Sequence, residues 1–398
     1  MSRPNYLVIL TDAAPDMRTS TVREVIDLLA ECKKNSILTI VLTAHSVNNI
    51  EYKDATHAIY IKTPFYKNKN YFLRVISENW LSLALILSFL WRFGFRINIR
   101  GVAWISPSIF NVWCALFLKT TYKAKIYLIL RDLFPFWMSN ASIIKNNGFF
   151  FRILKLIADI QMNISDRIGV ESPSTISFFQ EVYPKHLPKV EVLWNWMSLT
   201  GGDLRMIFNI QKISFIYAGN LGKAQGSEMF LALCERYASD PDVEIHFIGR
   251  GTEYEKILSF KQEKNIRCLN IHSQLSPEEI DDFIRKNSIG LVFLRPDLNA
   301  SNIPGKFMSY VLNGLPVLAS INPENDLCTI IKKFEMGRVD SSGQRESFIL
   351  MAEEMIEDYR NSFFCSKKIV SNAQNLFSSQ KAFMQLTSFL NNHHSEVL

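Results

Sequence analysis

Short apolar runs alternate with longer amphipathic stretches along most of the chain. The short runs have the length of buried strands, and the stretches between them repeat their apolar positions at helical spacing. This alternation indicates βαβ units and a mainly parallel sheet. In the first half the predicted strands are Tyr6–Thr11, Leu38–Thr43, Ala58–Ile61, Val102–Ile105, Ile126–Leu130, Arg167–Val170 and Val190–Trp194. The predicted helices include Thr21–Cys32, Tyr71–Trp91, Ile109–Lys119, Phe149–Met162 and Thr175–Val182.

The alternation is interrupted at Ser198–Asp203, which contains two adjacent glycines and is the predicted linker. It then begins again. The predicted strands of the second half are Ser214–Ala218, Glu244–Ile248, Ile289–Leu294 and Pro316–Ala319. The predicted helices are Gln225–Tyr237, Glu253–Glu263, Pro277–Lys286, Lys306–Leu312, Asp326–Phe334, Ser347–Tyr359 and Ser379–Asn391.

The pattern therefore predicts an α/β protein with two doubly wound, Rossmann-like domains. We expect domain boundaries at 1–200 and 201–375, with a C-terminal helix and polar tail at 376–398 that packs back on the first domain. Ligands of open parallel sheets bind beyond the carboxyl ends of the strands. We therefore expect the site in an interdomain cleft, in the loops after the strands and at the helix starts that follow.

Composition fits a chain of this kind and limits where it works. A chain of 398 residues is long enough for two cores. None of its six cysteines forms a C-x-x-C pair, so we expect reduced thiols in the cytoplasm. No signal peptide is expected. The longest apolar run, Trp80–Trp91, is shorter than the roughly 20 residues that a bilayer span needs.

Charge is distributed unevenly between the halves. Residues 1–200 contain 23 Lys and Arg against 14 Asp and Glu, whereas residues 201–398 contain 21 against 24. A first half with a net charge of +9 is expected to meet an anionic partner, either phospholipid head groups or a diphosphate. No nucleic-acid motif accompanies the charge, so we expect no nucleic-acid partner.

Three segments carry candidate chemistry. In the first, a strand beginning at Phe215 runs into a glycine-rich loop and a helix start, which favours phosphate. Its candidate ligand-binding residues are Gly219, Asn220, Gly222 and Lys223. The spacing differs from the dinucleotide fingerprint, which disfavours a dehydrogenase. The structural alternative is a plain tight turn between strand and helix.

The second segment is Asn302–Ser320, where Pro304 suits a first helical turn and Gly305 leaves the helix start open to an anion. Lys306 lies within reach of that anion, and Ser309 follows one turn later, about 4.5 Å along the axis. An ammonium and a hydroxyl on one face are suited to a diphosphate and a ribose. The alternative is a structural helix whose lysine faces solvent.

The third segment is Tyr127–Trp137, where the neighbouring ions Arg131 and Asp132 follow a buried strand directly. Charged residues at such a position cost stability unless they are paired or used. We name both as catalytic candidates, with Asp132 as the base if one is needed. The alternative is an Arg–Asp pair that holds the loop.

Taken in order, these segments resemble family 4 glycosyltransferases of the GT-B fold. The motifs are Ile105-Ser-Pro107, Arg131-Asp-Leu-Phe-Pro135, Val192-Leu-Trp-Asn195, the loop 219–226, Ile248-Gly-Arg-Gly251, Ile303-Pro-Gly-Lys306 and Gly314–Ser320. The resemblance covers roughly residues 5–385. It is of the bacterial O-antigen, lipopolysaccharide and capsule polysaccharide type, and nearest to L-fucosamine transferases.

The resemblance implies a hexosyltransferase, retaining and metal-independent, with no cofactor. The second domain would bind the nucleotide-sugar donor, UDP-linked, through the glycine loop, Gly249 and Arg250, and the helix start at Pro304. Arg131 stands where the family usually has a histidine near the donor sugar. The chain departs from the family at Ser301 and Ser309, where the family usually has two glutamates, and in lacking glycines after the first strand.

We expect the acceptor to be a lipid-linked (polyprenyl diphosphate) glycan, with the protein peripheral on the inner face of the plasma membrane. Gly148–Met162 and Trp80–Trp91 are apolar segments with nearby cations, typical of an interfacial helix or of a core helix with snorkelling cations. The alternatives are a catalytically silent GT-B partner subunit and a nucleotide-sugar epimerase. The sequence leaves open the sugar, the base, the linkage, the acceptor and the oligomeric state.

Overall fold

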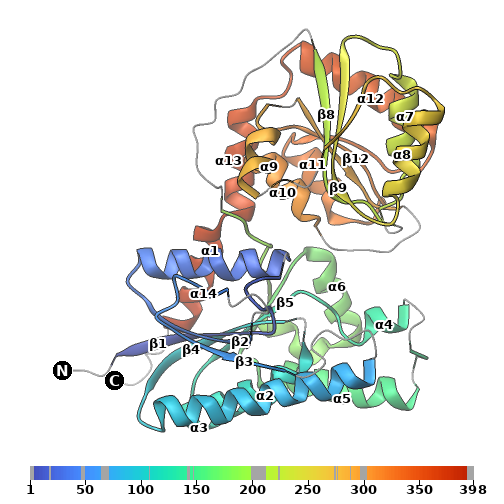
Figure 1. Ribbon diagram of the computed structural model, residues 1–398. Helices are drawn as coiled ribbons and strands as arrows, with labels where there is room; N and C mark the ends of the chain where they lie inside the picture. Colours follow the sequence, from blue (N-terminus) through green and yellow to red (C-terminus); the bar gives the residue numbers. More distant parts are fainter. Residues whose placement is uncertain are drawn as a thin grey trace. The chain divides into compact units, whose positions relative to one another are not determined.

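Figure 1 shows the computed structural model of the protein, in which the chain divides into two compact α/β units. Unit 1 comprises residues 1–196 and 379–398, and unit 2 comprises residues 197–378. The structure describes residues 4–17, 19–45, 50–63, 71–106, 108–140, 144–146, 148–198, 212–222, 225–272, 275, 277–286, 288–295 and 303–391. Most of the predicted linker lies outside these ranges.

Unit 1 is built on a seven-stranded parallel sheet in the order β3-β2-β1-β4-β5-β6-β7. Its strands are β1 (Asn5–Thr11), β2 (Leu38–Ala44), β3 (His57–Ile61), β4 (Asn98–Ile105), β5 (Ile126–Leu130), β6 (Arg167–Val170) and β7 (Val190–Val192). The central strands are buried on both faces, as expected for a parallel sheet covered by helices.

Helices cover both faces of this sheet (Figure 1). The helical segments are α1 (Ser20–Lys34), α2 (Tyr71–Phe93), η1 (Ile109–Asn111), α3 (Val112–Tyr122), α4 (Phe136–Asn140), α5 (Phe149–Ile164), α6 (Pro173–Val182), η2 (Pro184–Lys189) and α14 (Ser379–Asn391). One face packs against α1 and α14, whose Leu386 is fully buried. The other packs against α2, α3, α5 and α6. The last helix of the chain thus belongs to the core of unit 1.

Unit 2 repeats the plan with six parallel strands in the order β10-β9-β8-β11-β12-β13. The strands are β8 (Ile213–Asn220), β9 (Val243–Arg250), β10 (Leu269–His272), β11 (Ile289–Phe293), β12 (Val317–Ser320) and β13 (Gly337–Asp340). The helices are α7 (Glu228–Arg236), α8 (Tyr254–Glu263), α9 (Pro277–Ile284), α10 (Gly305–Leu312), α11 (Asp326–Lys333), α12 (Arg345–Arg360) and α13 (Ser366–Phe377).

The sequence pattern missed the two edge strands of unit 2, β10 and β13, together with α4 and α13. An edge strand of four residues such as Gly337–Asp340 has only two buried positions, one of them an aspartate, so it produces no apolar run. In unit 1, β7 ends at Val192, two residues before its predicted end. All six cysteines are free, and five of them are buried.

Candidate functional site

The predicted donor-binding residues of unit 2 that the structure describes gather beyond one end of its sheet, with Ser309 one turn further along α10. Gly219 and Asn220 end β8, and in the parallel register they lie opposite Gly249 and Arg250, which end β9. The start of α10 joins them, because an ideal Cβ on Gly219 would lie 3.6 Å from Cε of Lys306. The structure therefore brings the end of β8, the end of β9 and the start of α10 together. Lys223 and Ser301 lie outside the described residues.

The glycines of this cluster have different reasons to be glycine. A Cβ on Gly249 would lie 1.9 Å from the carbonyl oxygen of Gly219, so β8 and β9 approach too closely for any side chain there. Gly251, with φ +143°, is as tightly enclosed against the carbonyl of Leu221. Gly305 is the opposite case, because a Cβ there would meet no atom of the described residues within 4 Å. The start of α10 is therefore open among these residues, whereas Gly249 and Gly251 are closed.

Lys306 packs against a group of aromatic side chains that the sequence did not reveal. Its ammonium donates a hydrogen bond to the hydroxyl of Tyr217 and lies 3.7 Å from the centroid of that ring. The Tyr217 hydroxyl donates in turn to the carbonyl of Asn220 at 2.8 Å. Phe247 and Phe293 stack on either neighbouring strand, with centroids 5.8 and 5.7 Å from Tyr217. The aliphatic stem of Lys306 thus lies along the exposed Gly219.

Burial of the Lys306 ammonium lowers its pKa to about 7, against an ordinary value of 10.5. Part of the residue stays accessible, at the open start of the helix. The lysine is therefore poised to take up a proton when an anion arrives, since an adjacent negative charge favours the ammonium form. Such a cation beside an open helix N-terminus is a physical basis for diphosphate binding.

Tyr310 fixes the position of α10. Its hydroxyl accepts a hydrogen bond of 2.7 Å from the backbone N–H of Ala218, one residue before Gly219. Its ring fills the space that a side chain at Gly290 would need, with a hypothetical Cβ only 2.4 Å away. Burial raises the pKa of Tyr310, so the phenol stays neutral. In the sequence, the only indication of this residue was its place in the predicted helix, one turn after Lys306.

Ser309 is directed to another part of unit 2. Its hydroxyl donates to the buried carboxylate of Asp281 at 3.2 Å, which belongs to α9. Asn313 donates to the carbonyl of Ser309, and Arg285 donates to the amide oxygen of Asn313 at 3.0 Å. Lys306 and Ser309 thus contact different elements. The contact of Ser309 with a ribose stays a prediction. The structure adds Asp281 as a partner of the same hydroxyl within the protein.

In unit 1, Arg131 forms an ion pair with Glu24 of α1, across 3.2 Å, a long-range partner that the sequence did not indicate. Arg131 also donates to the carbonyl of Leu193 at 3.0 Å, and its guanidinium lies 5.0 Å from the ring of Trp196. With a side chain only 8% exposed, it joins α1 to the ends of β5 and β7.

Glu171 is a buried carboxylate in the same region that sequence analysis missed. It follows β6 directly, as Arg131 follows β5, and accepts a hydrogen bond from the side-chain amide of Asn195 at 3.3 Å. Desolvation by burial raises its pKa to about 7, although the charge of Arg131 acts in the other direction. Burial also raises the pKa of Glu24. One guanidinium therefore lies near two buried carboxyls, that of Glu24 in α1 and that of Glu171 after β6.

Asp132 lines a separate cavity of about 250 Å³ within unit 1. A polar wall contains Glu78, which accepts from Ser108 at 2.5 Å and from Arg74 at 2.6 Å. The other lining residues are apolar or aromatic: Val75, Ile109, Phe110, Phe134, Met138, Phe150 and Leu154. Carboxylates beside aromatic rings suit a hydroxylated ring, because the former accept hydroxyl hydrogen bonds and the latter cover its apolar face.

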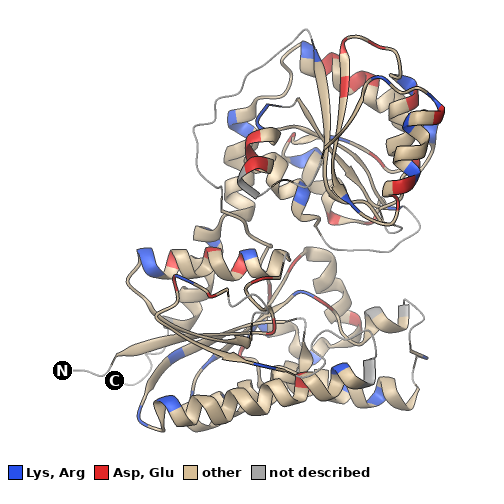
Figure 2. Cartoon of the chain, viewed as in Figure 1, with Lys and Arg blue, Asp and Glu red and all other residues tan. Residues whose placement is uncertain are grey.

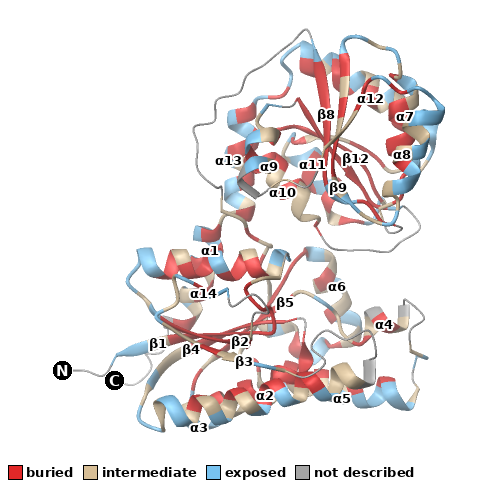
Figure 3. Cartoon of the chain, viewed as in Figure 1, coloured by how far each residue is buried: buried red, intermediate tan, exposed pale blue. Residues whose placement is uncertain are grey.

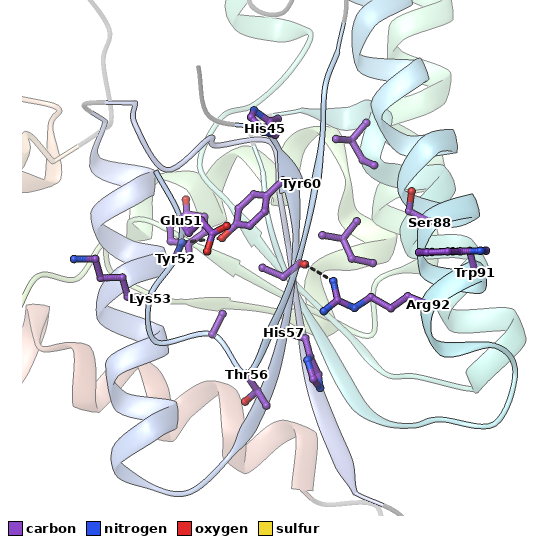
Figure 4. A pocket seen from close by; sticks show the side chains of 14 residues that line it. His45, Glu51, Tyr52, Lys53, Thr56, His57, Tyr60, Ser88, Trp91 and Arg92 are labelled. Atoms are coloured by element: carbon purple, nitrogen blue, oxygen red, sulfur yellow. Dashed lines mark hydrogen bonds between the residues drawn. The ribbon is translucent and has the colours of Figure 1, made fainter. Parts of the chain in front are cut away.

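A larger, open hollow of about 620 Å³ lies beside β3, at the edge of the same sheet (Figure 4). It contains none of the predicted site residues. Arg92 of α2 crosses it to donate to the carbonyl of Ala58 at 3.2 Å, which caps part of the strand edge. We therefore place the candidate site at the strand ends and not in this larger hollow. Among the described residues, no cluster of three or more His, Cys, Asp or Glu is placed to hold a metal.

Comparison with known proteins defines the fold. No family model and no curated protein matches the sequence. Among solved structures, HepE from Anabaena in complex with UDP is 10% identical over 98% of this chain and all of that one, with a TM-score of 0.67. A glycosyltransferase from Rickettsia africae is 11% identical over the full length of both chains, with a TM-score of 0.68.

WaaG, a glycosyltransferase of lipopolysaccharide biosynthesis, is 12% identical over 96% of this chain and 99% of its own, with a TM-score of 0.64. These similarities extend over both units. The protein therefore has the GT-B fold, the two-domain architecture of these glycosyltransferases, as predicted. The interdomain cleft and the roles of single residues stay predictions.

Proposed function

We propose that the protein is a glycosyltransferase that moves a sugar from a UDP-linked donor to a lipid-linked acceptor in bacterial surface polysaccharide synthesis. The observation that supports it most is Lys306, a cation held by Tyr217 at an open helix start. Structural neighbours bound to UDP or to UDP-glucose support a nucleotide-sugar as the donor. An amino- or deoxy-sugar is our proposed donor sugar, and retention our proposed outcome.

In the proposed reaction, the bond between the anomeric carbon and the diphosphate oxygen breaks, and its electron pair leaves with the diphosphate. Lys306, protonated when the donor binds, and the open N–H groups of α10 stabilise that charge. The acceptor hydroxyl forms the new bond, and its proton passes either to the departing phosphate or to a carboxylate such as Asp132. Arg131, tied to Glu24, positions the β5 loop that carries Asp132.

The cavity that contains Asp132 is our proposed acceptor pocket. It is the size of a single ring, it pairs carboxylates with aromatic side chains, and it belongs to unit 1 alone. Phe150 lines it and is 39% exposed, so the apolar wall continues onto the surface of α5. That continuity favours an acceptor with an apolar portion. We accordingly propose that the protein acts on the inner face of the plasma membrane, without a metal.

Calorimetric titration with UDP-, GDP- and dTDP-sugars tests the donor, followed by a transfer assay on a polyprenyl diphosphate glycan. We expect a UDP-sugar to bind and Lys306→Ala to lower transfer at least tenfold. Lys332→Ala, which removes an exposed lysine from α11, is the matched control and should retain wild-type activity. Full activity of Lys306→Ala, or no heat with any donor, would refute the proposal.

A catalytically silent partner subunit is the second candidate. The engagement of Ser309 with Asp281 favours it, because the family usually places a ribose-binding glutamate at that position. Donor binding without turnover on any lipid acceptor would identify this alternative.

A further inference from the structure

Helix α2 exposes its apolar residues and hides its polar ones. From residue 73 to 91, every exposed side chain is large and apolar. They recur every three or four residues and so form one stripe along the helix. The stripe consists of Ile76, Trp80, Leu83, Leu87 and Trp91, with exposed fractions of 46, 51, 53, 67 and 90%. A solvent-facing helix surface normally has the reverse pattern.

The opposite side of α2 belongs to the core of unit 1. Leu81, Leu85 and Phe89 are at most 1% exposed and pack against the sheet. The polar Ser82 is also buried, and its hydroxyl accepts from the N–H of Cys114 in α3. Figure 1 shows α2 lying along the sheet. It packs against α3, and Val75 near its start lines the same cavity as Phe150 of α5. The stripe is therefore the outer surface of a helix that is fixed in place.

By length and composition, Leu73–Phe93 could also cross a membrane, although 33% of its most apolar stretch is buried. Crossing would remove Leu81, Leu85 and Phe89 from the core and expose the sheet beneath them. It would also carry Glu78 and its partner Arg74 into hydrocarbon. The packing of α2 thus favours a helix that lies flat on a bilayer over one that spans it.

The charges around the stripe favour an anionic bilayer as its occupant. Residues 71–100 contain four arginines and one acidic residue, Glu78, which is buried and paired. Arg92 in the last turn of α2 and Arg96 just beyond it are exposed, and Phe95 between them is 72% exposed. Figure 2 shows α2 uncharged over most of its length, and Figure 3 shows its exposed positions. A second copy would bring the same positive charge against itself, whereas phosphatidylglycerol would neutralise it.

We propose that α2 docks unit 1 flat on an anionic membrane, with the stripe at the boundary between head groups and acyl chains and with Arg92 and Arg96 among the head groups. Trp80 and Trp91 then lie at the interface, where tryptophan is favoured. The neighbouring α5 adds Phe149, Ile153 and Leu156, with exposed fractions of 82, 41 and 62%. Only the purpose of this docking, the delivery of a lipid-linked acceptor, rests on the proposed function. The physical argument for the docking does not depend on it.

Vesicle binding of the full chain tests the surface without any sugar, so its result is independent of the proposed reaction. We expect co-sedimentation with vesicles containing 30% phosphatidylglycerol, weaker but persistent binding in 0.5 M salt, and at least tenfold weaker partitioning of the Leu87→Gln, Trp91→Gln double variant. Leu350→Gln is the matched control, because Leu350 is 61% exposed on α12 of unit 2. Near-ultraviolet circular dichroism verifies that each variant is folded.

Orientation is tested by spin labels on Ile76→Cys and on Trp91→Cys, in a Cys365→Ser background that removes the exposed cysteine. The two positions are about 22 Å apart along the helix. We expect equal immersion depths, since a flat helix holds both at the interface. A difference approaching 22 Å would show a spanning helix and overturn the proposal. So would wild-type binding by the double variant, or a lipid-free dimer that the double variant abolishes.

Discussion

The two units share one architecture but differ in how many large apolar side chains they expose and in which charged groups they bury. Among the described residues, fourteen of the sixteen exposed large apolar side chains belong to unit 1, and only Leu350 and Phe363 belong to unit 2. Unit 1 also buries Glu171 and Glu24 around Arg131. A doubly wound sheet therefore does not determine what its surface meets. We propose that unit 1 meets a bilayer and that unit 2 meets a water-soluble, anionic ligand.

One buried group in each unit makes an opposite contribution to the pH dependence of stability. Glu171 has a raised pKa of about 7, so its protonated form is favoured in the native state between about pH 4.5 and 7, and its contribution to the stability of unit 1 falls as the pH rises through that window. Lys306 has a lowered pKa of about 7, so its neutral form is favoured in the native state between about pH 7 and 10.5. Its contribution to the stability of unit 2 therefore rises with pH through that second window.

The largest effect should come from the closed glycine of unit 2. Gly249→Ala places a methyl group 1.9 Å from the Gly219 carbonyl and should cost roughly 3 kcal/mol or more of stability, because two backbone strands must separate. Hydrogen exchange of β8 and β9 amides measures this loss. Gly305→Ala, into open space, is the control and should change stability by about 1 kcal/mol or less. Equal effects of the two changes would contradict the distinction between closed and open glycines.

Glu171→Gln should stabilise unit 1 by roughly 2–3 kcal/mol at pH 8 and by much less at pH 5, because it removes a carboxylate that must ionise while buried. All seven tryptophans of the chain lie before residue 197, so fluorescence during urea unfolding reports on unit 1 alone. Glu181→Gln, on the exposed end of α6, is the control. A pH-independent difference between Glu171→Gln and the wild type would show that burial does not shift this group.

Tyr310→Phe should cost about 1–2 kcal/mol in unit 2, since the Ala218 N–H loses its acceptor, and should weaken donor binding by loosening α10. The exchange rate of the Ala218 amide proton is the direct measurement. Tyr237→Phe is a stringent control, because the buried Tyr237 hydroxyl has no hydrogen-bond partner among the described residues. We expect that variant to be at least as stable as the wild type.

The smallest expected effect is the uptake of a proton when the donor binds. Binding of a UDP-sugar at pH 7.5 should take up roughly half a proton or more, because the diphosphate raises the pKa of Lys306 from about 7. Calorimetry in two buffers of different ionisation enthalpy measures the uptake. Lys306→Arg, always charged, should bind with none. Uptake that persists in Lys306→Arg would assign the proton to another group.

Much of the fold was predictable because strands buried on both faces leave short apolar runs. Ile126–Leu130 and Arg167–Val170 begin and end where the pattern places them. The edge strand Gly337–Asp340 left no such run, since few of its positions are buried. The glycine motif and Lys306 were also visible in the sequence, because tight turns and helix starts have local signatures.

The sequence by itself determined two doubly wound units, the chain segments that end their strands, and the uneven distribution of charge. Which side chains contact one another was decided only by the tertiary structure. It paired Arg131 with Glu24, 107 positions away, buried Glu171, and turned Ser309 toward Asp281. It also decided that α2 faces outward with Trp80 and Trp91, because a helix that is apolar on both sides carries no sign of which side the core will cover.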